Sequence, residues 1–190
     1  MQYPQIQRII GILLMLFSTS MLPAAGVGFY YNEPAMNAFL SGFAITMVAG
    51  ALIWYPMHGQ RNELRTRDGY LITVLFWLVL GLFGAVPLWL LDMPDLSVAD
   101  AVFESFSGLT TTGATVITGL DTLPRALLYY RQQLQWFGGM GIIVLAVAIL
   151  PMLGVGGMQL YRAEMPGPLK ENKLTPRIAE TAKVLWYIYA

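Results

Sequence analysis

Long apolar stretches are the feature of this sequence that most constrains its fold. A helix that crosses a bilayer needs about 20 apolar residues. Residues 9–31, 35–57 and 70–91 meet that length without a single charged residue. A fourth stretch, residues 123–153, is polar in its first third and strongly apolar from Trp136 onward. The sequence therefore predicts an all-α membrane protein built from transmembrane helices.

The composition agrees with lipid as the main solvent. Charged residues make up 12% of the chain, against about 25% in soluble domains. A net charge of zero argues against a nucleic-acid partner. The chain has no cysteine and a single histidine, His58, which excludes disulfides and cysteine- or histidine-rich metal sites. No nucleophile has a visible base beside it, so we do not expect an enzyme.

The charged residues predict the orientation in the membrane. Basic residues gather around the predicted ends on one side, at Arg8, Arg61, Arg65, Arg67, Arg162, Lys170, Lys173 and Arg177. Acids gather on the other side, at Glu33, Asp92, Asp95, Asp100 and Asp121. The positive-inside rule then places the N-terminus in the cytoplasm. The outer acids either concentrate cations at a vestibule or form an ordinary solvated loop.

This orientation predicts a re-entrant hairpin over residues 93–122, because the third and fourth spans must both reach the outer face there. Residues 98–110 have apolar positions near helical spacing, and Ser97 or Asp100 can cap that helix. Such a helix is about 20 Å long and reaches about halfway through the membrane. Non-helical backbone at that depth must be buried in protein or line water.

The segment "TTTGAT", residues 110–115, follows this short helix directly. Backbone carbonyls that point inward can replace the water shell of a cation, and Gly113 permits the unusual backbone angles that this needs. The C-terminal end of the helix dipole also favours a cation. The candidate ion-binding residues are Thr111, Thr112, Gly113, Ala114 and Thr115. The alternative is an ordinary helix end with a left-handed glycine cap.

Other polar and small residues in this part of the chain have one or two structural interpretations each. Glu104 either ties the short helix to Arg131 or faces the outer water. Thr122 and Pro124 are interpreted as the cap and first-turn proline of the last span. Three glycines of that span are either a hinge or a place for close helix packing; they are Gly138, Gly139 and Gly141.

From Glu104 onward the sequence resembles the bacterial TrkH-type potassium uptake subunits of the Trk/Ktr/HKT superfamily. The motifs that carry the resemblance are "TTTGAT", "RQQLQWFGGMGIIVLAVAILP" and "GGMQLYRAEMPGP". The resemblance implies four repeats, each with an outer helix, a re-entrant pore helix with a filter loop, and an inner helix. Gly113 stands where the first filter glycine of the family stands. The resemblance also divides the chain into three parts. Residues 1–69 form an N-terminal two-helix hairpin with a cytoplasmic loop, residues 70–160 form one repeat, and residues 161–190 form a cytoplasmic connector with the start of a further helix.

The resemblance also implies a transported ligand, partners and a location. The ligand is a potassium ion, taken up passively or with a coupling ion, and no cofactor is expected. The sequence holds one "TTTG" motif, so we expect an N-terminal fragment of a longer chain, or several copies around one axis. The family further implies a homodimer, a cytosolic nucleotide-binding regulatory subunit of the TrkA type, and the bacterial inner membrane. The alternative function is a structural or assembly subunit of the membrane with no ion path of its own.

Overall fold

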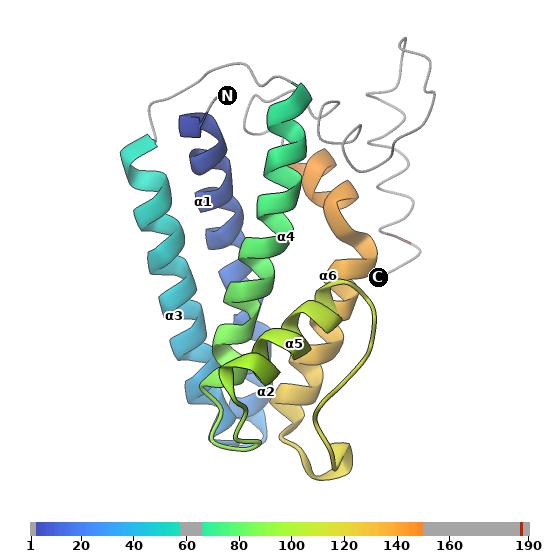
Figure 1. The fold of residues 1–190 in the computed structure, drawn as a ribbon. Coiled ribbons are helices and arrows are strands. Elements are labelled where there is room, and N and C mark those ends of the chain that lie inside the picture. The colour runs from blue at the N-terminus through green and yellow to red at the C-terminus, as the bar shows by residue number, and fades with distance from the viewer. Residues whose placement is uncertain (1–2, 58–65, 150–186, 188–190) are drawn as a thin grey trace.

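The computed structural model describes residues 3–57, 66–149 and 187. Within these ranges the regular structure is entirely helical (Figure 1). In chain order the helices are α1 (Tyr3–Thr19), α2 (Met21–Tyr30), α3 (Ala35–Trp54), η1 (Tyr55–Met57), α4 (Thr66–Trp89), α5 (Val98–Leu109), η2 (Leu120–Thr122) and α6 (Arg125–Ile149).

The helices confirm the predicted spans. Tyr3–Tyr30, Ala35–Met57 and Leu71–Trp89 are long and apolar enough to cross a membrane. The first span is interrupted at Ser20, because Pro23 has no N–H to donate to the backbone oxygen of Thr19. The fourth predicted stretch forms α6, and it begins at Arg125.

The helix that contains the third span starts before the apolar stretch. Helix α4 begins at Thr66 rather than at Tyr70, and it includes Asp68 in its first turn. The side chain of Asp68 is fully buried. A carboxylate in the first turn is stabilised by the positive end of the helix dipole, so this acid extends the helix beyond its apolar stretch.

Small residues let the helices approach closely. A Cβ atom added to Gly11 of α1 would lie 2.9 Å from the carbonyl oxygen of Gly50 in α3, and one added to Gly50 would lie 2.9 Å from that of Gly11. A Cβ added to Gly42 would meet Pro87 of α4 at 2.9 Å. Backbone-to-backbone contact of this kind is the usual way for helices to associate in a bilayer.

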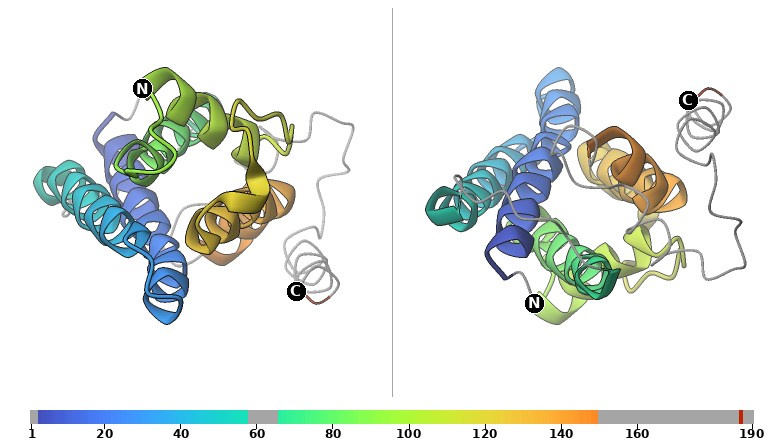
Figure 2. Two further views of the ribbon diagram at one scale, coloured as in Figure 1. Left: turned by 90° about the horizontal axis from the view of Figure 1, so that it is seen from below. Right: turned by 90° about the horizontal axis from the view of Figure 1, so that it is seen from above.

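The re-entrant hairpin is present. Figure 1 shows α4 ending near the lower end of the molecule, where α5 starts and turns back upward. The chain then returns to the same end before α6 begins (Figure 1). Figure 2 shows α1–α3 on one side of the molecule and α5 between α4 and α6.

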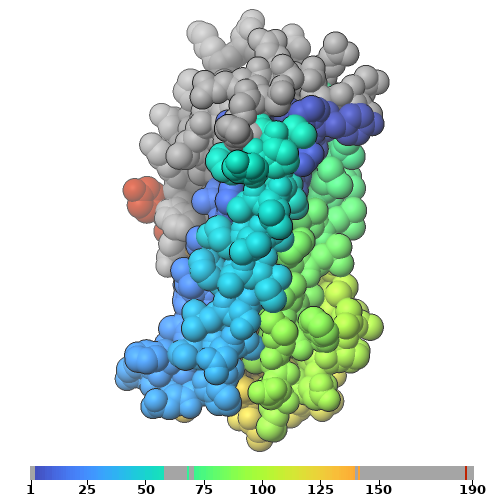
Figure 3. All heavy atoms as spheres, turned by 90° about the vertical axis from the view of Figure 1, so that its left-hand side faces the viewer, coloured from blue at the N-terminus to red at the C-terminus, as the bar shows by residue number. Residues whose placement is uncertain are grey.

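Helix α3 lies on the outer surface of the molecule (Figure 3). The large apolar side chains that it exposes are Leu40, Ile45, Val48 and Leu52. An exposed apolar stripe along a spanning helix suits contact with lipid chains.

Candidate functional site

Helix α5 starts with a capping box. The Oγ of Ser97 accepts a hydrogen bond from the Asp100 backbone N–H at 3.2 Å, and the Asp100 carboxylate accepts one from the Ser97 N–H at 3.2 Å. Both residues that the sequence offered as caps therefore act together. Asp100 belongs to the start of the helix rather than to a free acidic loop.

The end of α5 leads directly into the loop of residues 110–119, which we call the filter loop after the role that the sequence predicts for it. The N–H groups of Thr112 and Gly113 donate to the Ser107 carbonyl at 3.0 and 3.4 Å. Thr111 has φ 55° and Gly113 has φ 72°. A positive φ is unusual for a β-branched residue and costs on the order of 1–3 kcal/mol. The Thr111 N–H also donates to the Gly108 carbonyl at 2.9 Å, so α5 ends in a Schellman motif with Thr111 as its left-handed residue. Gly113 is a second left-handed residue, which this helix end does not require.

Ser107 holds the inner half of the filter loop. Its hydroxyl donates to the carbonyl oxygen of Ala114 at 2.6 Å. The hydroxyls of Thr110 and Thr112 lie 2.8 Å apart, and that of Thr110 also donates to the Phe106 carbonyl. The loop is thus fixed to the last turn of α5 by side chains as well as by backbone.

Glu104 holds the outer half of the filter loop. Its Oε1 accepts hydrogen bonds from the Thr115 hydroxyl at 2.5 Å and from the Val116 N–H at 2.7 Å. Its Oε2 accepts one from Nε of Arg131 at 3.0 Å. Glu104 is only 3% exposed, so the structure selects the tie to Arg131 over contact with outer water. Thr115 in turn accepts the Ile117 N–H at 3.0 Å.

One face of α6 supports the filter loop from the other side. Its contacts come from Arg131, Gln135 and Gly138, which share a face at helical spacing. A Cβ on Gly113 would lie 4.0 Å from Nε2 of Gln135. A Cβ on Gly138 would overlap the Leu109 carbonyl at the end of α5.

The three glycines of α6 have different surroundings. Gly138 serves close packing, whereas Gly141 has φ 40° and ψ −155° and interrupts the helical geometry. Gly139 is exposed. Of the two alternatives that the sequence left open, close packing is found at Gly138, while Gly141 interrupts the helix and its role as a hinge stays a prediction.

The start of α6 corrects a prediction. Thr122 does not cap this helix, because its hydroxyl donates to the Gly119 carbonyl at 2.9 Å. The capping group is the carboxylate of Glu33, which accepts from the Arg125 N–H at 2.8 Å and the Ala126 N–H at 3.0 Å. Pro124 immediately precedes the helix.

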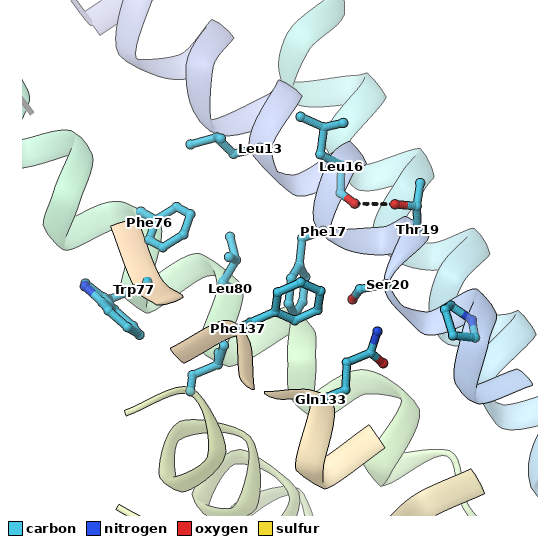
Figure 4. A pocket seen from close by; sticks show the side chains of 13 residues that line it. Leu13, Leu16, Phe17, Thr19, Ser20, Phe76, Trp77, Leu80, Gln133 and Phe137 are labelled. Carbon is cyan, nitrogen blue, oxygen red and sulfur yellow. Dashed lines mark hydrogen bonds between the residues drawn. The ribbon is translucent and has the colours of Figure 1, made fainter. Parts of the chain in front are cut away.

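An apolar cavity of about 380 Å³ lies at the inner end of α5 (Figure 4). Its lining comes from α1, α2, α4, α5 and α6 and includes Phe17, Phe76, Leu80 and Phe137. Thr111 to Thr115 do not line it. The described residues of the lining include no ionisable side chain.

The structure describes only some of the remaining residues that the sequence analysis singled out. Asp92, Asp95 and Asp121 are exposed. Among the described residues no group of three or more His, Cys, Asp or Glu side chains is arranged to hold a metal ion. His58 and the predicted basic residues from Arg162 to Arg177 lie outside the described residues.

Sequence reasoning missed two residues of this site. Ser107 lies one turn after Glu104 on α5, and the i, i+3 spacing places both on one face. That spacing could have indicated a second contact to the loop. Glu33 gave no local signal, since its partners lie 92 and 93 residues further along the chain.

Comparison with known proteins agrees with this architecture. The family model described as "TrkH: Cation transport protein" matches residues 35–190. The chain is 62% identical over 189 residues to the Trk system potassium uptake protein TrkH of Vibrio parahaemolyticus and 64% identical over 190 residues to that of Halomonas elongata. Each match covers 100% of this chain and 39% of the relative, so the chain spans about two fifths of the length of these relatives.

A solved structure shows the same fold. The crystal structure of the potassium transporter TrkH from Vibrio parahaemolyticus matches with a TM-score of 0.78 and 56% sequence identity. The match covers 100% of this chain and 37% of that one. With three helices in the described part of the chain able to span a bilayer, the protein is a membrane protein. Together with the family match over residues 35–190, this shows that the chain belongs to the TrkH family of cation transport proteins.

Proposed function

We propose that this chain supplies the first of four pore-loop repeats that form a potassium-selective filter for ion uptake. The observation that carries the proposal is the filter loop itself. It follows the C-terminal end of a re-entrant helix, exposes residues 110–116, and contains two left-handed residues at Thr111 and Gly113. A left-handed residue at every second position turns successive carbonyls toward one side of the chain, which is the arrangement that a dehydrated cation requires.

The filter residues divide between ligation and support. We assign the backbone oxygens of Thr111, Thr112 and Gly113 to the ion. The Ala114 carbonyl already accepts the Ser107 hydroxyl, so we do not assign it to the ion. The small side chain of Ala114 instead lets the backbone come close to the pore axis. Thr115 keeps its carbonyl for the ion, while its hydroxyl holds the loop from behind through Glu104.

The proposed setting is the bacterial inner membrane, with the N-terminus in the cytoplasm. The relatives are named as parts of a Trk system, and they are potassium uptake proteins rather than enzymes. We therefore infer that the other filter loops come from further repeats of the same transporter, which forms a homodimer. A nucleotide-binding regulatory subunit of the TrkA type binds the cytoplasmic face.

The test is a pair of glycine substitutions in the complete transporter, Gly113→Ser and Gly119→Ser. Both glycines have positive φ, at 72° and 69°, so a serine is strained at either position. We expect Gly113→Ser to lower the preference for potassium over sodium in uptake assays, and Gly119→Ser to leave it unchanged. An unchanged preference in Gly113→Ser would favour the structural or assembly role instead.

A further inference from the structure

We propose that the N-terminal hairpin (residues 3–57) positions the filter loop, and that it does so through the carboxylate of Glu33. This inference rests on the proposed function of the loop. The hairpin lies outside the pore repeat, and the architecture of the repeat does not by itself explain what the hairpin does. Its contacts with α6 indicate one.

The turn between α2 and α3 fixes the backbone of Glu33. The Glu33 N–H donates to the Gly28 carbonyl at 2.8 Å, and the Asn32 N–H donates to the Phe29 carbonyl at 3.2 Å. Asn32 has φ 54°. These are the two hydrogen bonds and the left-handed residue of a Schellman motif, which places Glu33 rigidly after the end of α2.

Glu33 completes the hydrogen bonding at the start of α6. The first free N–H groups of this helix belong to Arg125 and Ala126, since Pro124 has none and Leu127 donates to the Pro124 carbonyl at 3.0 Å. The two carboxylate oxygens of Glu33 accept one N–H each. The negative charge also lies at the positive end of the helix dipole.

Aromatic contacts extend this attachment along α6. The guanidinium carbon of Arg125 lies 4.1 Å from the ring centroid of Tyr31, in a cation–π arrangement. Further along α6, the rings of Phe39 and Tyr130 lie 5.1 Å apart, and the fully buried Tyr130 donates its hydroxyl to the Gly84 carbonyl. The hairpin therefore contacts the first two turns of α6.

The residue after Tyr130 carries the attachment to the filter loop. Arg131 bonds Glu104, and Glu104 bonds Thr115 and Val116. A helix moves as a rigid body over two turns, so a shift at Arg125 is passed to Arg131. We infer that Glu33 is a positioning residue for the outer half of the filter loop.

The experiment compares three variants of the complete transporter: Glu33→Gln, Tyr31→Leu and Asp92→Asn. Glutamine offers one acceptor oxygen, so it leaves one N–H of α6 without its partner. Asp92→Asn is the matched control, because it also removes one outer negative charge, at an exposed residue, but no cap. Tyr31→Leu removes the ring contact of Arg125 and keeps every acidic side chain.

Two readouts separate positioning from a merely structural role. The first is the preference for potassium over sodium per folded transporter, which a simple loss of folded protein does not change. The second is hydrogen exchange at the N–H groups of Val116 and Ile117, which bond Glu104 and Thr115. We expect Glu33→Gln to lower the preference roughly twofold or more and to raise exchange at both sites. Tyr31→Leu should act in the same direction, and Asp92→Asn should match the unaltered protein.

Two results would overturn the inference: normal preference and exchange in both Glu33→Gln and Tyr31→Leu, or an equal loss of preference in Asp92→Asn. The second result would mean that surface charge is the cause. Gly113→Ser in the same assay separates this failure from failure of the proposed function. If only Gly113→Ser lowers the preference for potassium over sodium, the proposed filter is supported and the proposed role of Glu33 is rejected.

Discussion

Glu104 joins the outer half of the filter loop to α6. A buried ion pair by itself is weak support for stability, because taking two charges out of water offsets their attraction. Here the Glu104 carboxylate also accepts the Thr115 hydroxyl and the Val116 N–H. These bonds make the carboxylate a fixed reference point between α5, α6 and the loop.

We predict that Glu104→Gln destabilises the protein by about 3–5 kcal/mol, because it leaves Arg131 buried without its charged partner. The side chain of Arg131 is 12% exposed, so water replaces the lost contact poorly. Unfolding in detergent measures the loss. The control is the pair Glu104→Gln with Arg131→Gln: if the double variant is as unstable as the sum of the two single variants, the two residues are not coupled.

A neighbouring pair of serines allows a sharper comparison. Ser107→Ala removes the hydroxyl that bonds Ala114, at an expected cost of about 1 kcal/mol, and it frees the Ala114 carbonyl. Ser105→Ala is the matched control, because the buried Ser105 hydroxyl has no hydrogen-bond partner in the described part of the chain. We expect altered potassium preference and lower stability only in Ser107→Ala. Equal behaviour of the two variants would argue against a role for the Ser107 bond.

At the scale of elements, the contact between α5 and α6 decides where the filter loop lies. Gly108 and Gly138 bring the two helices together, since a Cβ on Gly108 would lie 2.9 Å from Cβ of Leu134. Neither helix can move away without changing the distance between Glu104 and Arg131. The packing of two small residues is thus linked to the ion pair.

Gly138→Ala should separate α5 from α6, because its added methyl group overlaps the Leu109 carbonyl. We expect a loss of thermal stability in detergent and a lower potassium preference. Gly26→Ala in α2 is the control, as nothing lies within 4 Å of its Cβ position. In that helix alanine should be neutral or stabilising by up to about 1 kcal/mol. A stable Gly138→Ala variant would show that the helices can adjust.

The sequence predicts these elements better than it predicts their ends. Spans and the re-entrant helix follow from apolar length and charge, and the Ser97 cap of α5 follows from a local pattern three residues long. The cap of α6 could not be predicted, because Glu33 reaches it only after folding. The same holds for the Ala114 carbonyl, whose direction depends on Ser107. The sequence does not predict the positive φ of Thr111 either, because among the residues of this segment only Gly113 adopts a positive φ readily.

At the scale of the whole molecule, the chain combines spans that cross with one segment that does not. Residues 93–124 leave and return at one end of the molecule, and the η1 turn after α3 lies at the other (Figure 1). We propose that this arrangement places the filter loop inside the membrane thickness while both of its connections stay outside.

Cysteine labelling tests this arrangement directly, because the chain has no cysteine of its own. We expect Asp95→Cys and Asp121→Cys to react with a membrane-impermeant reagent from the same side, and Pro56→Cys to react only from the opposite side. All three positions are exposed. Labelling of the two acidic positions from opposite sides would contradict the re-entrant hairpin and the filter assignment together.

The close approach of Gly11 and Gly50 has a consequence for biosynthesis. Ribosomes make the chain from its N-terminus, so α1 and α3 leave the ribosome before α6 exists. With their glycine surfaces already complementary, the two helices can pair as soon as both enter the bilayer. The carboxylate after α2 is then in place when residue 125 is synthesised, and the early part of the protein serves as a template on which the later helix docks.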